Sequence, residues 1–316
     1  MRVGPYHVRR KEDDSNFFIQ NVTFSLTTLS HYWNTKNFDL KNHQNTLFPY
    51  AYNILGTVED AKDAIQDVLA KYQSINPAHI KNEMGYLTKS VINRSINIKN
   101  RKAKITMQKV WLPEPISTEK ADDNLIGEEI LSYSLLVLFE KLTTRERAVF
   151  ILKEAFDYSH KEIAETIGIS IENSRKLLSR GKLKLGAHKT SSPKNYSAVP
   201  SPHMENYIHA IKNGEVKLLG EMLSEDVALS ADGGKDIKVI RELTTGKMAT
   251  SNLLFYVFKT YQKSLSIEVS EVNHQPALLF FDGDILINCQ VFEFENSKIR
   301  HIYAVIDPNK LKTFFR

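Results

Sequence analysis

The stretch at residues 158–185 constrains the fold most, because it carries the signals of two short helices joined by a tight turn. Ser159, followed three residues later by Glu162, is typical of a capping box that starts a helix. Gly168 suits the end of that helix, since glycine adopts the left-handed C-terminal conformation without a side-chain clash. Ser170 can then cap the second helix. The pattern predicts a helical hairpin with a sharp, glycine-dependent turn.

The second helix of this hairpin is one-sided. Leu177, Leu178 and Leu185 recur at helical spacing and form a stripe that can be buried. The opposite face is basic and polar, and consists of Asn173, Arg175, Lys176, Ser179, Arg180, Lys182 and Lys184. Small Ala164 allows the two helices to cross closely, so the pattern indicates a helix-turn-helix with a basic recognition helix. A solvated amphipathic hairpin is the alternative that the pattern leaves open.

Composition sets the broad class. The chain has 316 residues, enough for two to three domains, and 42% of them are hydrophobic. It has no apolar run long enough to span a bilayer and no convincing signal peptide. The single cysteine, Cys289, excludes an internal disulfide and a cysteine zinc site, and fits a reducing cytoplasm.

Positive charge is concentrated in the first two thirds of the chain. Residues 204–316 hold 13 Lys and Arg against 15 Asp and Glu, whereas residues 1–203 hold 29 against 22. The basic excess accompanies the helix-turn-helix, which favours a polyanionic partner for that part. The last third has no such bias and is expected to have another role.

Two helices are expected within residues 46–73, with Gly56 ending the first and Thr57 capping the second. The outward face of the second helix is polar and acidic, and consists of Asp60, Asp63, Gln66 and Asp67. Such a face is often simply solvated, and it can also dock on a partner.

A further helix is expected at residues 84–104, with Tyr86 among its core contacts. Asn93 and Asn97 lie four residues apart on one face of it. The helix then runs into Lys99, Arg101, Lys102 and Lys104. Amides that can pair with base edges, beside cations that hold phosphates, suit single-stranded or distorted nucleic acid.

Two linkers divide the chain into parts. The first, residues 107–125, contains Trp111-Leu112-Pro113-Glu114-Pro115, whose prolines enforce an extended backbone. Its Trp-Leu pair is expected to dock on another part of the chain or to pack on the adjacent helix. Helices within residues 126–157 support the helix-turn-helix, and a Ser- and Pro-rich linker follows at residues 189–202.

Residues 203–316 change character. Helical stretches at 203–212, 215–223 and 249–262 surround or precede alternating runs that predict a curved antiparallel sheet, an α+β pattern. A strand there ends in the loop Asp232-Gly233-Gly234-Lys235. No second carboxylate or histidine nearby pairs with Asp232 as an acid–base couple, so an enzyme is not expected.

The order of acidic helix, Asn-bearing basic helix, linker and helix-turn-helix resembles a bacterial RNA polymerase sigma factor of the extracytoplasmic-function class, over about residues 44–188. The resemblance implies that Asp60, Asp63, Gln66 and Asp67 dock on the clamp helices of the polymerase core. It implies that the helix with Asn93 and Asn97 reads the −10 element and that the helix-turn-helix reads the −35 element. The family usually has Asp where Asn97 stands.

A narrower resemblance is to the sigma subgroup with a fused SnoaL-like domain. It rests on Trp111–Pro115, on Asn173–Leu177, on the Asp232–Lys235 loop (one glycine short of the subgroup's motif) and on Asp307–Leu311. It implies two all-α sigma domains and a C-terminal α+β SnoaL-like cone that regulates them in cis through Trp111–Pro115 and Asp232–Lys235. Promoter DNA and the polymerase core are the expected partners, no cofactor is expected, and a small ligand in the cone stays open.

The expected division is an unassigned extension, a region-two-like domain, a linker, a region-four-like domain, a second linker and a regulatory domain, at residues 1–40, 41–106, 107–125, 126–188, 189–202 and 203–316. Two rival functions remain at this point. One is a conventional helix-turn-helix regulator whose C-terminal domain senses a small molecule. The other makes the C-terminal domain an enzyme, since its fold relatives include isomerases and hydrolases.

Overall fold

The computed structural model describes residues 42–75, 80–103, 110–118, 129–186, 201–235, 237, 239, 243–312 and 314. The extension at residues 1–40 and most of the linker at 189–202 lie outside the described residues. From Asn45 onward the chain forms one compact unit. Within the described ranges, no helix combines the length and the apolar character needed to cross a bilayer.

Three helices form the first half of the sigma-like region. They are the helix at residues 42–55, α2 (Val58–Gln73) and α3 (Glu83–Ala103). The predicted apolar face of α2 is buried and packs against α3. Two details of the prediction were wrong. Tyr86 is 37% exposed, and the Thr57 side chain does not cap α2, because its hydroxyl donates to Asp60 instead (2.6 Å).

The predicted helix-turn-helix is confirmed. It consists of α6 (His160–Ile167) and α7 (Ile171–Leu185), preceded by α4 (Tyr133–Leu138), a 3₁₀ turn η4 (Phe139–Lys141) and α5 (Thr144–Glu154). The capping box of α6 is present, and Gly168 has φ of +67°, the left-handed conformation that the turn requires. The leucine stripe of α7 is buried against α5.

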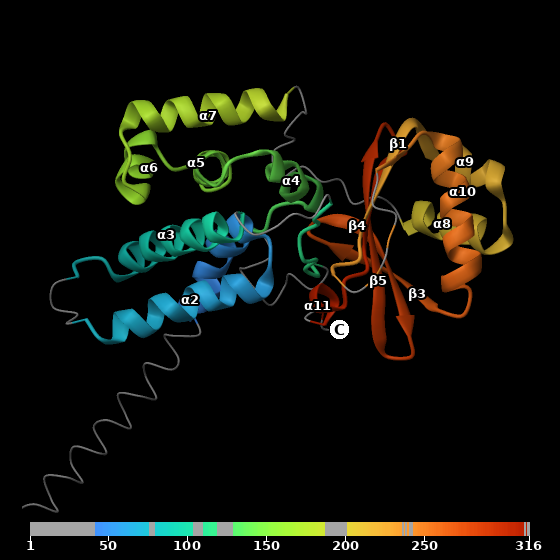
Figure 1. The fold of residues 1–316 in the computed structure, drawn as a ribbon, viewed down its shortest axis with the longest axis horizontal. Coiled ribbons are helices and arrows are strands. Elements are labelled where there is room, and N and C mark those ends of the chain that lie inside the picture. The colour runs from blue at the N-terminus through green and yellow to red at the C-terminus, as the bar shows by residue number, and fades with distance from the viewer. Residues whose placement is uncertain are drawn as a thin grey trace, which may run out of the picture. The chain divides into compact units, whose positions relative to one another are not determined.

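The C-terminal part is an α+β domain, as predicted. Helices α8 (Ser201–Asn213), α9 (Val216–Met222) and α10 (Lys247–Val257), which continues as a π-turn η5 (Phe258–Gln262), lie on one face of a six-stranded sheet (Figure 1). The strands are β1 (Leu223–Asp232), β2 (Thr244–Thr245), β3 (Ser266–Val272), β4 (Gln275–Asp282), β5 (Ile285–Glu295) and β6 (Lys298–Val305). A short helix α11 (Pro308–Leu311) follows them.

The strand order is β2-β1-β6-β5-β4-β3, and the sheet is not wholly antiparallel as expected, because β1 pairs with β6 in parallel. One face of the sheet packs on α8–α10, with Leu278, Phe280 and Phe292 in that core. The other face has a second core. Leu112 of the linker and Tyr133 of α4 are buried in it, so the sigma-like region supplies part of the hydrophobic packing of this domain.

Candidate nucleic-acid interface and its interdomain contacts

The basic face of α7 is held in place by contacts from its inner side. Ser170 caps the helix, and the buried Ser174 hydroxyl lies 2.9 Å from Nδ1 of His160 at the start of α6. This hydrogen bond fixes the two helices of the motif against each other. On the outer side Arg175, Lys176 and Arg180 are exposed.

The remaining predicted residues of this face divide into two groups. Ser179 is exposed and Asn173 is half-buried. Lys182 pairs with Glu154 of α5 (2.9 Å), and Lys184 pairs with Glu146 (2.6 Å). Both lysines therefore also brace α7 on α5.

The asparagine face of α3 lies against the helix-turn-helix. Asn93 donates from Nδ2 to the Lys89 carbonyl (2.8 Å) and to the Thr166 carbonyl near the end of α6 (2.7 Å). Asn97 and Arg101 are exposed. The structure thus leaves Asn97 accessible and occupies the Asn93 amide.

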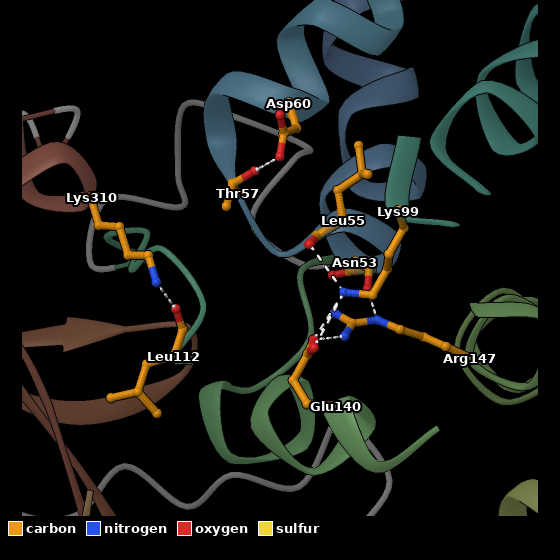
Figure 2. Close-up of polar contacts among 9 residues, drawn as sticks. All are labelled: Asn53, Leu55, Thr57, Asp60, Lys99, Leu112, Glu140, Arg147 and Lys310. Carbon is orange, nitrogen blue, oxygen red and sulfur yellow. Dashed lines mark hydrogen bonds and ion pairs between the residues drawn. The ribbon is translucent and has the colours of Figure 1, made fainter. Parts of the chain in front are cut away.

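Lys99 does not lie on the exposed basic face expected from the sequence. Its ammonium is nearly buried, pairs with Glu140 (3.0 Å) and lies 5.2 Å from the ring centroid of Trp111. Glu140 also pairs with the fully buried Arg147, whose Nε donates to the Asn53 carbonyl (3.0 Å). Figure 2 shows Lys99, Arg147 and Glu140 converging on one point between the helices. We therefore leave Lys99 out of the residues proposed to contact DNA.

The charges of this network shift each other's protonation. Burial, with a contribution from the Arg147 charge, lowers the pKa of the Lys99 ammonium to about 8, although Glu140 opposes the shift. Burial also acts to raise the pKa of Glu140, but Arg147 and Lys99 outweigh it and hold that pKa below its ordinary value. At neutral pH the network therefore carries two cations and one carboxylate.

The Lys99 shift predicts a pH-dependent stability. Between about pH 8 and pH 10.5 the unfolded chain binds more protons at this group than the folded chain, so its contribution to the free energy of unfolding rises with pH. The gain is about 3 kcal/mol at most. Urea unfolding of wild type and Lys99→Met at several pH values measures it. If the free energy of unfolding changes with pH by the same amount in both proteins between about pH 8 and pH 10.5, the prediction is contradicted.

The acidic face of α2 is only partly free. Asp60 accepts from Lys102 (2.7 Å) and Asp67 from Arg94 (2.5 Å), both on α3. Asp63 and Gln66 are exposed. The carboxylates of Asp60 and Asp67, whose side chains are 17% and 46% exposed, therefore reach across from their outward helical positions to the basic side chains of α3.

The linker motif Trp111–Pro115 contacts both α3 and the C-terminal domain. The Trp111 ring lies close to two ammonium groups. Its centroid is 5.2 Å from Nζ of Lys99 and 4.5 Å from Nζ of Lys310. The Leu112 N–H donates to Asp232 Oδ2 (2.8 Å), and the Leu112 carbonyl accepts from the Lys310 ammonium (2.5 Å). The same ammonium forms an ion pair with Asp232 (2.6 Å). Figure 2 shows the Lys310–Leu112 contact. The structure thus brings the linker and the Asp232 loop together.

The second half of the motif binds the region-two-like helices. The buried Glu114 carboxylate accepts from the N–H of Val58, the first residue of α2 (2.7 Å), at the helix end where Thr57 was expected to supply the cap. The Glu114 carbonyl accepts from the Tyr52 hydroxyl (2.7 Å). Pro113 and Pro115 are buried beside it. The extended linker segment therefore supplies the hydrogen-bond acceptor at the N-terminus of α2.

The glycines of the loop are required by geometry. Gly234 has φ of +66°, and a Cβ there would meet the Asp307 carboxylate at 2.4 Å. A Cβ on Gly233 would meet the Ile237 carbonyl oxygen at the same distance. Lys235 is exposed at the rim of the loop. This backbone conformation lets the Asp232 carboxylate accept from the Leu112 N–H of the linker.

Sequence reasoning missed several residues of these contacts, namely Asn53, Glu140, Arg147 and Lys310. Lys310 lies within the Asp307–Leu311 motif, which was noticed only as a resemblance. Asn53 carries no local signal, because its partners Glu129 and Arg147 lie 76 and 94 residues away. Glu140 lies only seven residues from Arg147, but its other partner, Lys99, is 41 residues away. Among the described residues, no group of three or more His, Cys, Asp and Glu side chains could hold a metal ion.

Comparison with known proteins gives a consistent set of relatives. The family described as "Sigma-70, region 4" matches residues 132–185. "Probable ECF RNA polymerase sigma factor SigI" of Mycobacterium tuberculosis is 24% identical over 281 residues, which cover 85% of this chain and 92% of that protein. "ECF RNA polymerase sigma factor SigJ" of the same species is 30% identical over 207 residues, or 62% of this chain and 64% of that protein.

The architecture matches a solved structure over most of the chain. The crystal structure of the M. tuberculosis extracytoplasmic-function sigma factor SigJ superposes with a TM-score of 0.71 at 19% sequence identity. The match covers 87% of this chain and 98% of that one. The fold is therefore shared over the matched part of the chain.

Proposed function

We propose that the chain is an extracytoplasmic-function sigma factor, and that its SnoaL-like C-terminal domain holds it in a closed form that cannot engage a complete promoter. As a sigma factor it directs RNA polymerase to promoter DNA. The single observation behind the proposed closed form is the hydrogen bond between Asn93 Nδ2 and the Thr166 carbonyl, 2.7 Å long. It joins the proposed −10 reader to the proposed −35 reader.

A length estimate supports this proposal. Elements named for positions −10 and −35 lie about 25 base pairs apart, which is roughly 85 Å of duplex at about 3.4 Å per base pair. Helices α3 and α6, in contrast, are in direct contact. A factor that reads both elements must separate the two halves, so this arrangement corresponds to the inhibited state.

The proposal is tested with the full-length chain. Core polymerase from the source organism transcribes its genomic DNA with and without the purified factor, and the RNA 5′ ends are sequenced. Wild type should initiate weakly at a defined set of start sites, and variants that loosen the linker contact should initiate strongly at the same sites. If neither wild type nor such variants add start sites, the sigma function is wrong.

On the DNA side, we propose that Arg175, Lys176 and Arg180 contact the −35 element, with Asn97 and Arg101 near the −10 element. Replacing one base-reading arginine costs about 1–3 kcal/mol and relaxes specificity at one position. Arg175→Ala should therefore weaken the best promoters most. Lys217→Ala, which removes a charge from the exposed face of α9, is the control. Equal weakening of all promoters would make Arg175 a phosphate contact only.

On the polymerase side, we propose that α2 docks on the clamp helices through the exposed Asp63 and Gln66, with Asp60 and Asp67 joining once α3 releases them. Reversing one charge at such a contact costs several kcal/mol, because like charges then face each other. Asp63→Lys should lower core affinity by about a hundredfold or more in a fluorescence titration. Glu205→Lys makes the same change on the exposed face of α8 and should bind normally.

A small polar ligand in the C-terminal domain is a further proposal, supported by buried polar atoms. The Tyr207 hydroxyl and the side-chain oxygens of Asn288 and Gln290 are buried without a hydrogen-bond partner among the described residues. Asn288 and Gln290 pair across strands with Phe280 and Leu278, which lie in the helix-covered core. Native mass spectrometry of the wild type should show a mass excess that Gln290→Leu loses. An unliganded mass in both would reject this proposal.

No enzymatic activity is proposed. In the described part of the C-terminal domain, Ser230 and His301 form a serine–histidine pair, in which the hydroxyl lies 2.9 Å from Nε2. Burial, with the nearby Arg300 charge, lowers the pKa of His301 to about 4. A base that weak does not activate a serine well at neutral pH, since an effective general base has a pKa near the working pH.

A further inference from the structure

The turn between β3 and β4, Asn273-His274, has its first residue buried and its second half-buried, where a hairpin tip is normally exposed. Both residues have positive φ, +46° and +60°, as a tight two-residue hairpin requires. The comparable turn between β5 and β6, Asn296-Ser297, has φ of +51° and +61° and is exposed. Asn273, however, is 0% exposed. We call Asn273-His274 the hairpin tip.

Asn273 bonds to three separate segments of the sigma-like region. Its Oδ1 accepts from the Ile116 N–H of the linker (2.9 Å), and its own N–H donates to the Ile116 carbonyl (2.9 Å). Its Nδ2 donates to the Tyr52 hydroxyl of the helix at residues 42–55 (3.0 Å) and to the Leu131 carbonyl ahead of α4 (3.2 Å). Its carbonyl accepts from the Tyr133 N–H (3.3 Å).

The backbone N–H and the backbone carbonyl of Leu131 are both hydrogen-bonded to asparagine side chains. Asn53, which is also fully buried, accepts from the Leu131 N–H (3.1 Å), while Asn273 donates to the Leu131 carbonyl. Asn53 belongs to the region-two-like half, and Leu131 begins the region-four-like half. The hairpin tip therefore reaches the junction where the two promoter-reading halves meet, a place separate from the Asp232 contact.

Few side chains satisfy this position. The backbone needs a residue that tolerates positive φ, which favours Gly, Asn and Asp. The side chain needs an acceptor for Ile116 and two donors for Tyr52 and Leu131, and an ionised Asp has no donor. Asn provides all of these within one short side chain.

We propose that the hairpin tip is a second interdomain fastening, by which the C-terminal domain binds the two promoter-reading halves together, and that Asn273 is its positioning residue. This inference rests on the proposed cis regulation and assigns it a site that is distinct from the Asp232 loop. Release of the tip frees the linker, the helix at residues 42–55 and the start of α4 at once. The two halves then separate.

The test uses full-length variants with a matched turn as the control. Asn273→Gly keeps the turn and removes the side-chain bonds, Asn273→Asp keeps only the acceptor, and Asn296→Gly makes the same change in the exposed hairpin. Fluorescent labels at Lys89→Cys on α3 and Glu172→Cys on α7 report separation by energy transfer. They can be attached selectively, because the native Cys289 is buried. Initiation by core polymerase is measured in parallel.

Asn273→Gly should lower energy transfer and raise promoter-specific initiation about five- to thirtyfold. Asn273→Asp should change both in the same direction, and Asn296→Gly should match the parent protein. Energy transfer in Asn273→Gly equal to that in Asn296→Gly overturns the proposal. Lower energy transfer accompanied by reduced initiation by folded protein overturns its inhibitory sense. If no variant supports initiation, the sigma function fails, but energy transfer still decides whether the tip fastens the halves.

Discussion

Asp232→Ala is expected to release the linker and to raise initiation by the full-length factor, at a large cost in stability. Asp232 is 2% exposed and accepts from the Leu112 N–H, the Gly234 N–H and the Lys310 ammonium. Without it, the nearly buried Lys310 keeps only the Leu112 carbonyl and the Trp111 ring. Removing one partner of a buried ion pair costs about 3–5 kcal/mol. Urea unfolding and promoter-specific transcription measure the two effects.

Two variants separate charge from hydrogen bonding at this site. Asp232→Asn keeps an acceptor for only one of the two backbone N–H donors, Leu112 and Gly234, and loses the charge, so it should fall between wild type and Asp232→Ala. Adding Lys310→Met to Asp232→Ala removes the unpaired cation and should recover part of the lost stability. If the double variant is as unstable as the sum of the singles, Lys310 is not the reason for the cost.

The sequence predicted the elements well wherever the physical cause is local. Ser159 and Glu162 form the predicted capping box, and Gly168 takes the left-handed conformation, because each signal acts within one helical turn. The alternating runs became β3–β6 for the same reason. The parallel pairing of β1 with β6 was missed, because it joins strands about 70 residues apart.

The contacts at the candidate site were harder to predict, because they are polar and distant. Tyr52 and Asn273 are 221 residues apart, and an Asn-His turn looks the same whether its tip is exposed or buried. Asp60 and Asp67 occupy outward helical positions, yet α3 supplies cations to both. Helical periodicity predicts which face of a helix a residue occupies, but it does not predict which neighbouring element covers that face. Exposure of polar residues could be predicted only with the tertiary arrangement in hand.

Glu140→Ala is the second change with a large expected effect. Glu140 is the carboxylate that separates Arg147 of the region-four-like half from Lys99 of the region-two-like half. Without it, two buried cations face each other between the halves. The expected loss of stability is about 2–4 kcal/mol, below the usual upper value for a buried pair because the Glu140 side chain is 31% exposed.

A double-mutant cycle with Lys99 tests where this cost arises. Lys99→Met alone should change stability by less than about 1.5 kcal/mol at pH 7, because Glu140 keeps the buried Arg147 as its partner and no carboxylate is left unpaired. In the Glu140→Ala background the same change removes the repulsion with Arg147, so it should restore stability. Coupling below about 0.5 kcal/mol would contradict this account. Because the repulsion acts between the halves, Glu140→Ala should also raise initiation, and the added Lys99→Met should lower it again.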